Sequence, residues 1–418
     1  MTVKVPELLA PSGSLEHLHM ALSYGADAVY AGIPRWSLRV RGNGFSREDF
    51  AAGIKEAHAL GRKFYAVLNV IPHARRTDSF LPALDEVAAL KPDAFIMADP
   101  GLIDTVLERH PEIPVHLSVQ ANTVNPLTVR FWKKIGISRC ILARELSLGE
   151  IEIIRNECPD TELEVFVHGA LCIAVSGRCL ISGLLARRDA NLGACNNSCR
   201  WNFNSRNIRC MTAEIEDSYN HPGQWMTLEE DTHGSYLMNS KDLCALPVID
   251  KLIRIGVDSL KIEGRSRSPF YAGIVSRAYR LAIDAIVNGG DVPAESYDLV
   301  NSIMARDYTT ALLEPHRPDE TQDYETNTPK RGVLEIVGKI VSQSADNVVT
   351  VEVKNHFESG SRLLVSTPSG FVPLDASTLR DLKGNPLDVA KGSGWTVTLR
   401  ADRQFDLSTA VLLRDDRA

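Results

Sequence analysis

The chain has 418 residues, of which 44% are hydrophobic and 24% are charged, a balance typical of a globular protein with a large core. The length is too great for one ordinary domain and short for three, and the net charge of −7 argues against indiscriminate nucleic-acid binding while leaving room for a local basic face. No apolar run reaches the roughly 18 residues of a membrane span, and the first residues lack the apolar core of a signal peptide. We therefore expect a cytosolic protein.

Short apolar runs rich in Val, Ile and Phe recur along the chain, with amphipathic segments between them. Eight runs lie at residues 7–11, 27–32, 63–69, 93–99, 115–120, 139–144, 163–169 and 259–264. Such runs suit parallel strands buried on both faces, and the segments between them often begin with Ser or Asn and end in Gly, as helices do. Eight strand–helix units favour a (β/α)8 TIM-like barrel. A doubly wound open sheet has the same local pattern and is the alternative.

Polar residues close most of these runs. In a barrel of this kind the carboxyl ends of the strands meet at one face, and that face carries the chemistry. A ring of polar side chains above an apolar core is what a binding pocket requires. The residues at the run ends are Pro11, Tyr30, Asn69, Asp99, Gln120, Arg144, His168, and Glu263 with Arg265.

The regular spacing breaks twice. Between the seventh and eighth runs, residues 170–258 form a cysteine-rich insertion in place of the usual helix. After a long helix pattern at residues 271–289, a polar linker at 316–332 is followed by short alternating runs separated by turn residues, which predict a small all-β barrel or sandwich. We expect a barrel domain at 1–315 and a C-terminal all-β barrel domain at 333–418.

Four of the eight cysteines open the insertion: Cys172, Cys179, Cys195 and Cys199. In a reducing compartment, grouped cysteines are more often ligands of a metal or cluster than disulfides. A zinc site usually shows two tight pairs, and only the second pair here is tight, so the spacing favours an iron–sulfur cluster over zinc or unliganded thiols. Cys140 lies inside a strand and reads as a core residue, and Cys244 is the substitute ligand if one of the four is wrong.

Several longer blocks carry a resemblance. "EVFVHGALCIAVSGRCLIS" (164–182), followed by "RRDANLGACNNSCRW" and "SLKIEGRSRSPFY", resembles the signature of the collagenase-like peptidase family U32, and "GADAVYAG" and "HLSVQANTVN" are similar to its N-terminal blocks. Within the family, the chain is most similar to the bacterial branch involved in tRNA hydroxylation.

This resemblance implies a tRNA-modifying enzyme that converts the wobble uridine to 5-hydroxyuridine with prephenate as co-substrate and without molecular oxygen. It also implies a four-iron four-sulfur (4Fe-4S) cluster, whose ligands carried over to this sequence are Cys172, Cys179, Cys195 and Cys199. In some relatives one ligand comes from elsewhere in the chain.

Candidate site residues follow from this chemistry. Prephenate carries two carboxylates, so paired cations are needed, and Arg144, Lys261 and Arg265 stand at strand ends. An ion pair with Glu263 or a neighbouring carboxylate is the alternative for Lys261. His168 is a candidate for moving a proton, or else a satisfied polar residue. Gln120, with Asn122 beside it, is a candidate for reading a pyrimidine edge, or else caps a helix.

A tRNA partner calls for cations and aromatic rings. Arg35, Arg39 and Arg41 interleave with Trp36 and Phe45 after the second run, a mixture suited to phosphate contact and base stacking. The insertion repeats the mixture with Arg200, Trp201, Phe203, Arg206 and Arg209. The C-terminal domain is either a second RNA-contact module or a packing or dimerisation domain.

Three other functions remain open at this point. A cysteine peptidase needs a thiolate beside an imidazole, and Cys172 lies four residues after His168. The chain has no H-E-x-x-H or G-x-S-x-G motif, and a nucleophile crowded by further thiols is an unusual arrangement, so we expect peptidase activity less than hydroxylation. A metal-dependent hydrolase and a non-catalytic RNA-binding partner are the remaining alternatives.

Overall fold

The computed structural model describes residues 4–38, 45–172, 174–175, 211–216, 225–231, 234–236, 241–304, 306–315 and 332–417. Eight parallel strands form a closed barrel in the order β12-β1-β2-β3-β4-β5-β6-β7, and β12 pairs with β7 to close it. The strands are β1 (Glu7–Ser12), β2 (Ala28–Gly32), β3 (Lys63–Leu68), β4 (Ala94–Met97), β5 (Val115–Leu117), β6 (Arg139–Ile141), β7 (Glu162–Ala170) and β12 (Ser259–Ile262). The predicted TIM-like barrel is confirmed, because an open sheet would lack the β12–β7 pairing.

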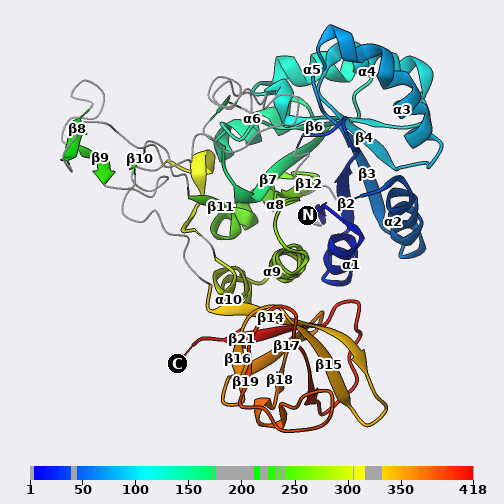
Figure 1. Ribbon diagram of the computed structural model, residues 1–418. Coiled ribbons are helices and arrows are strands. Elements are labelled where there is room, and N and C mark those ends of the chain that lie inside the picture. The colour runs from blue at the N-terminus through cyan, green and yellow to red at the C-terminus, as the bar shows by residue number, and fades with distance from the viewer. Residues whose placement is uncertain are drawn as a thin grey trace.

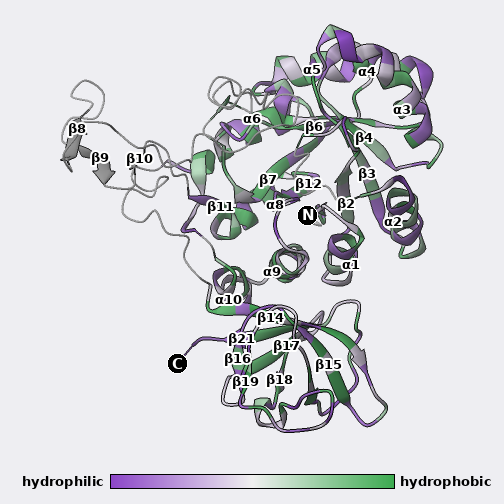
Figure 2. Cartoon of the chain, viewed as in Figure 1, coloured by the Kyte–Doolittle hydropathy of each residue, from purple (hydrophilic) through white to green (hydrophobic). Residues whose placement is uncertain are grey.

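Helices surround the barrel and turn their polar faces outward, while the strands inside are apolar (Figures 1 and 2). They are α1 (Leu15–Ser23), α2 (Arg47–Ala59), α3 (Phe80–Ala88), α4 (Pro100–Arg109), α5 (Pro126–Ile135), α6 (Leu148–Glu157), α8 (Ile249–Ile255), α9 (Pro269–Val287) and α10 (Ala294–Ser302). Short 3-10 turns lie at Ala74–Ser79, Val119–Ala121, Leu246–Val248, Ala311–Leu313 and Ala376–Thr378.

Helix boundaries follow the capping residues of the sequence. The Ser46 and Ser147 side chains accept hydrogen bonds from the backbone three residues on, and Asp49 and Glu150 complete both capping boxes. None of the helices in the described part of the chain is both long enough and apolar enough to cross a bilayer.

Strand β7 continues beyond the barrel and carries the insertion. Its last residues pair with antiparallel β11 (Asp242–Cys244), which pairs in turn with β13 (Tyr308–Thr309). The insertion also contains a small antiparallel sheet of β8 (Met211–Glu216), β9 (Trp225–Asp231) and β10 (Gly234–Tyr236). Residues 176–210, which hold three of the predicted cluster ligands, lie outside the described residues.

The C-terminal domain is antiparallel and all-β, as predicted. Its six-stranded sheet has the order β18-β17-β21-β14-β15-β20 and is joined by a two-stranded sheet, β16–β19. The strands are β14 (Leu334–Gln343), β15 (Val348–Val353), β16 (Phe357–Glu358), β17 (Leu363–Thr367), β18 (Gly370–Leu374), β19 (Val389–Ala390), β20 (Thr396–Arg400) and β21 (Val411–Asp415). A separate apolar cluster, including Val337, Val351 and Leu412, forms its core.

The two folded parts pack together through α1, α9 and α10 on one side and the six-stranded sheet on the other (Figure 1). The hydroxyl groups of Tyr24 on α1 and Ser366 on β17 lie 2.6 Å apart in a buried position, and Arg277 on α9 donates to the Pro368 carbonyl. Lys339 pairs with Glu16 at 3.0 Å on the surface. The predicted linker at 316–332 lies outside the described residues except for Gly332.

Candidate active site at the mouth of the barrel

Cations and aromatic rings alternate at the carboxyl ends of β2, β6, β7 and β12. The Lys261 Nζ lies 4.4 Å from the centre of the Tyr30 ring and 5.4 Å from that of Phe166. The Arg265 Cζ lies 5.7 Å from the centre of the Tyr30 ring, and the Arg144 Cζ lies 5.0 Å from that of Phe166. Each ring thus lies close to two cations, whose charge its negative face attracts. Three of the five predicted catalytic residues share this array.

Strand register explains this arrangement. Lys261 on β12 is the partner of Phe166 on β7, so both side chains point to the same side, into the barrel. Arg144 follows β6 and donates from Nη1 to the Ala170 carbonyl at 3.0 Å, which ties it to the end of β7. Tyr30 donates to the Ile262 carbonyl at 2.9 Å and to Glu263 at 3.1 Å, which fixes its ring beneath the mouth.

Lys261 is also the upper end of a buried ion network. Its Nζ lies 2.7 Å from the Glu164 carboxylate, which lies 3.1 Å from Arg139 Nη1. Arg139 reaches Glu7 at 2.6 Å near the amino end of the barrel. Burial lowers the pKa of Lys261, and Glu164 opposes the shift. The alternative of an ion pair for Lys261 is therefore confirmed, with Glu164 as partner.

A chain of hydrogen bonds connects Gln120 to Arg265 around the other side of the mouth. Ser118 donates to Gln120 at 3.3 Å and accepts from Asn69 at 3.5 Å. The Leu38 amide donates to the Asn69 side chain at 3.0 Å, and the Leu38 carbonyl accepts from Arg265 at 2.5 Å. Gln120 is thus buried and fixed in the same wall that holds Arg265, so a fourth predicted residue belongs to this site.

Two glycines allow the strands to approach at the mouth. A Cβ on Gly32 would lie 2.2 Å from the Ser37 hydroxyl oxygen and 2.4 Å from Arg265 Nη1, so glycine leaves room for both side chains. A Cβ on Gly169 would lie 2.3 Å from the Glu263 carbonyl oxygen, and Gly169 also has φ +109°. Both positions require glycine for steric reasons.

His168 lies on the opposite side of β7 from this array. A register shift makes His168 the partner of Ile262, whereas Phe166 is the partner of Lys261. Because neighbouring residues on β12 point to opposite faces, His168 shares the outward face of Ile262. Its fully buried ring packs among Tyr271, Tyr279 and Tyr308, with centroids 5.2–6.0 Å away.

The environment of His168 favours a neutral ring. Burial, with a smaller contribution from Arg267, lowers the pKa of His168 to about 3. Nδ1 lies 3.3 Å from the Tyr279 hydroxyl. This geometry separates His168 from the barrel interior and gives no support to its predicted role in moving a proton at the mouth.

The cysteines separate into two groups. Cys172 is exposed, two residues after the end of β7 and therefore beside the carbonyl that holds Arg144. Cys140 is fully buried and its pKa is raised to about 12 by burial, which confirms it as a core residue. Cys244 is buried under Tyr279 and its thiol pKa is also raised by burial.

These environments bear on the predicted cluster. An exposed thiol at the mouth fits an iron–sulfur ligand, whereas the buried Cys244 thiol is held in its protonated form. Cys179, Cys195 and Cys199 lie outside the described residues, and the described residues alone contain no group of three His, Cys, Asp or Glu side chains arranged to hold a metal ion. The four-cysteine ligand set stays a prediction.

The expected stacking role of Trp36 and Phe45 is wrong. Trp36 is 6% exposed and packs edge-on against Phe80 at 5.1 Å, and Phe45 is 3% exposed and packs against Phe50 and Phe64. Both rings are buried in the core between the barrel and its helices, which removes their large apolar area from water. Arg35 is exposed as expected, and Arg39 and Arg41 lie outside the described residues.

Glu164 and Phe166 are the site residues that the sequence reasoning missed. A carboxylate inside the apolar run "LEVFVHG" is a signal, since a buried charge needs a partner. Alternation along the same strand would have placed Phe166 beside it, facing inward.

A closed eight-stranded barrel with a polar, cationic mouth at the carboxyl ends of its strands is the architecture of a (β/α)8 enzyme. The model of "Peptidase family U32" matches residues 13–323, and that of "Peptidase family U32 C-terminal domain" matches residues 334–414. The chain belongs to peptidase family U32.

Relatives in this family carry different names. The chain is 43% identical to "tRNA hydroxylation protein P" of Escherichia coli over 98% of this chain and 97% of that protein. It is 42% identical to the protein of the same name from Haemophilus influenzae, over 98% and 96% of the two chains. It is also 33% identical to "Collagenase" of Porphyromonas gingivalis, over 69% and 68%.

Proposed function

We propose that the protein hydroxylates the wobble uridine of tRNA to 5-hydroxyuridine, with prephenate as co-substrate and with an iron–sulfur cluster. The observation that carries this proposal is the match to two proteins named for tRNA hydroxylation over 98% of this chain, barrel and C-terminal domain together. The geometry of the mouth supports it, because it concentrates cations where a small dicarboxylate and an RNA would meet.

Two arginines are placed to bind the carboxylates of prephenate. Arg144 lies next to the Phe166 ring and Arg265 next to the Tyr30 ring, and each donates to a backbone carbonyl, so their planar donors are fixed in orientation. Lys261 is 3% exposed and paired with Glu164, and it contributes positive potential from beneath the mouth. Gln120, held by Ser118, lines the same wall and is the candidate for reading the pyrimidine.

Glu263 is the carboxylate that we place at the reacting end. It is partly buried beside Tyr30, which donates to it, and burial, followed by the nearby Glu263 charge, raises the pKa of Tyr30 well above its usual value. Tyr30 therefore stays protonated and orients the Glu263 carboxylate, which can accept a proton released from the base.

The predicted cluster would be held by Cys172, Cys179, Cys195 and Cys199, and when bound it supplies electron transfer next to the substrate pocket. Arg144 connects the two parts of the site, because it donates to Ala170, two residues before Cys172.

A peptidase is the second candidate, suggested by the relative named "Collagenase". A cysteine peptidase would need Cys172 beside an imidazole. The described geometry opposes this pair, since Cys172 is exposed while His168 is fully buried among tyrosines on the outer side of β7.

Iron analysis and nucleoside analysis test the proposal together. Anaerobically purified protein should contain four irons and four sulfides per chain, as the proposed 4Fe-4S cluster requires, and Cys195→Ala should lose most of both. tRNA from a deletion strain should lack 5-hydroxyuridine by mass spectrometry. The wild-type gene should restore it, Arg144→Met should restore less than about a tenth of it, and the surface control Arg130→Met should restore it fully.

Two results would contradict the proposal. Zinc in place of iron, with normal tRNA in the deletion strain, would favour a hydrolase. Normal iron in Cys195→Ala would exclude the ligand set.

A further inference from the structure

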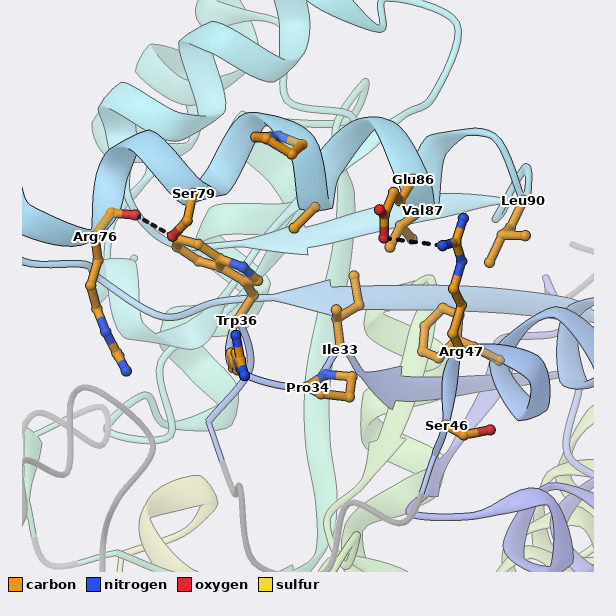
Figure 3. Close-up of a pocket in the computed structure, with 14 residues that line it drawn as sticks. Ile33, Pro34, Trp36, Ser46, Arg47, Arg76, Ser79, Glu86, Val87 and Leu90 are labelled. Carbon is orange, nitrogen blue, oxygen red and sulfur yellow. Dashed lines mark hydrogen bonds and ion pairs between the residues drawn. The ribbon is translucent and has the colours of Figure 1, made fainter.

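A pocket lies between the loop after β2, the start of α2 and helix α3. Its volume is about 560 Å³, within the range of small-molecule sites. Ile33, Val87 and Leu90 give it an apolar lining, and the largely buried Trp36 contributes a small part of its wall (Figure 3). The pocket is therefore large enough and apolar enough to take a planar base.

The rim of this pocket is cationic although the chain is acidic overall. Arg35, Arg47 and Arg76 line it against a single acidic residue, Glu86. In Figure 3, Arg76 lies at one end and Arg47 at the other, where it faces Glu86. That pair is 3.6 Å apart and its two side chains are 64% and 56% exposed, so it can exchange its internal contact for a ligand at little cost.

The other two arginines have no such contact. Within the part of the chain that the structure describes, the guanidinium groups of Arg35 and Arg76 make no hydrogen bond or ion pair. Both residues are exposed. Two free guanidinium groups on the rim of an apolar pocket are complementary to an anion attached to a flat ring, and a nucleotide has that chemistry.

Arg35 also occupies a backbone conformation that favours glycine. Its φ is +70°, and a residue with a large side chain is uncommon there. Replacing Arg35 with glycine therefore removes the guanidinium group without straining the loop.

The pocket wall is joined to the candidate active site. Arg35 and Trp36 belong to the loop whose Leu38 is held by Asn69 and by Arg265. The Val70 amide also donates to the Trp36 carbonyl at 3.2 Å. A ligand in the pocket is thus at a fixed position relative to Arg265.

We propose that this pocket binds one unpaired nucleotide of the RNA substrate next to the uridine that reacts. Its base packs against the apolar side chains of Pro34, Pro82 and Leu90, and its phosphates contact Arg35 and Arg76. The inference rests on the proposed function, since it requires an RNA substrate. It adds a specific binding site for single-stranded RNA outside the barrel mouth.

The test compares two double variants. The pocket variant combines Arg35→Gly with Arg76→Ala. The control combines Arg130→Ala with Arg400→Ala, which removes the same charge from exposed positions on α5 and β20. Binding of a fluorescent anticodon stem-loop is measured by anisotropy at several salt concentrations. The pocket variant should bind at least about tenfold more weakly, and its salt slope should fall by about two. The control should bind the RNA only about twofold more weakly, because it loses long-range electrostatic attraction but no direct contact.

A second readout locates the contact directly. With 4-thiouridine placed next to the target uridine, photocrosslinks should fall within residues 33–38 or 76–90. Because glycine suits φ +70°, the Tm of the pocket variant should be unchanged or higher, which excludes unfolding as the cause of weak binding.

The outcomes separate the two proposals. If the wild type binds RNA and restores 5-hydroxyuridine, but the pocket variant binds as tightly as the control, or crosslinks form only elsewhere, this pocket assignment is overturned and the proposed function stands. If the wild-type protein neither binds nor modifies tRNA, the proposed function fails, and this inference fails with it.

Discussion

Glu164→Gln removes a carboxylate that faces two buried cations, Lys261 at 2.7 Å and Arg139 at 3.1 Å. Breaking a buried ion pair by removing one partner costs about 3–5 kcal/mol of stability. Because two cations lose their shared partner here, we expect Glu164→Gln to lower the free energy of unfolding by about 4 kcal/mol. Lys261→Met leaves Glu164 with Arg139 and should cost less, about 2 kcal/mol. The double variant should cost about 4 kcal/mol, because the two losses overlap by about 2 kcal/mol.

Urea unfolding followed by circular dichroism at 222 nm measures these values. The signal reports the barrel domain, since the described helices longer than one turn all belong to it and the C-terminal domain is β-structured. A loss below 1 kcal/mol for Glu164→Gln, or strict additivity of the two single variants, would refute the idea that this network holds Lys261 in place.

Three other predictions concern stability. Gly169→Ala should lower the free energy of unfolding by about 3 kcal/mol, because the new Cβ would lie 2.3 Å from a backbone carbonyl oxygen and φ is +109°. The control Gly149→Ala lies in a helix, and its Cβ would have no atom within 4 Å. It should raise the free energy of unfolding by about 0.5 kcal/mol in the same urea assay. Burial lowers the pKa of His168 to about 3. As the pH falls below about 6.5, this imidazole therefore takes up a proton in the unfolded chain but not in the folded one. The free energy of unfolding should fall by about 2 kcal/mol by pH 5 as a result. His168→Phe should remove this part of the pH dependence and leave the part due to His116, whose pKa burial also lowers well below its usual value. An unchanged slope would contradict the assignment. Tyr24→Phe removes the 2.6 Å contact with Ser366 between the domains and should cost about 1 kcal/mol; no shift in Tm would mean that this contact is not needed for docking.

The sequence alone determined the eight strand–helix units, whereas the β12–β7 pairing of the tertiary structure decided for a closed barrel over an open sheet. Runs that are apolar throughout can be buried on both faces, so eight of them specify eight inner strands, and capping residues such as Ser46 and Ser147 specify where helices begin. Because the carboxyl ends of parallel strands meet at one face, Gln120, Arg144, Lys261 and Arg265 could be assigned to one site without coordinates.

Only the tertiary structure decided how these side chains are used. The side of β7 on which His168 lies depends on a register shift against β12, and no local pattern shows a shift in pairing between distant segments. The pairing of Glu164 with Lys261, 97 residues away, likewise requires the closed barrel. Trp36 has the neighbours of a surface loop in sequence, and it became a core residue because Phe80 of α3 packs over it. Local sequence sets which groups are available, and long-range packing sets which of them are buried, paired or exposed to a ligand.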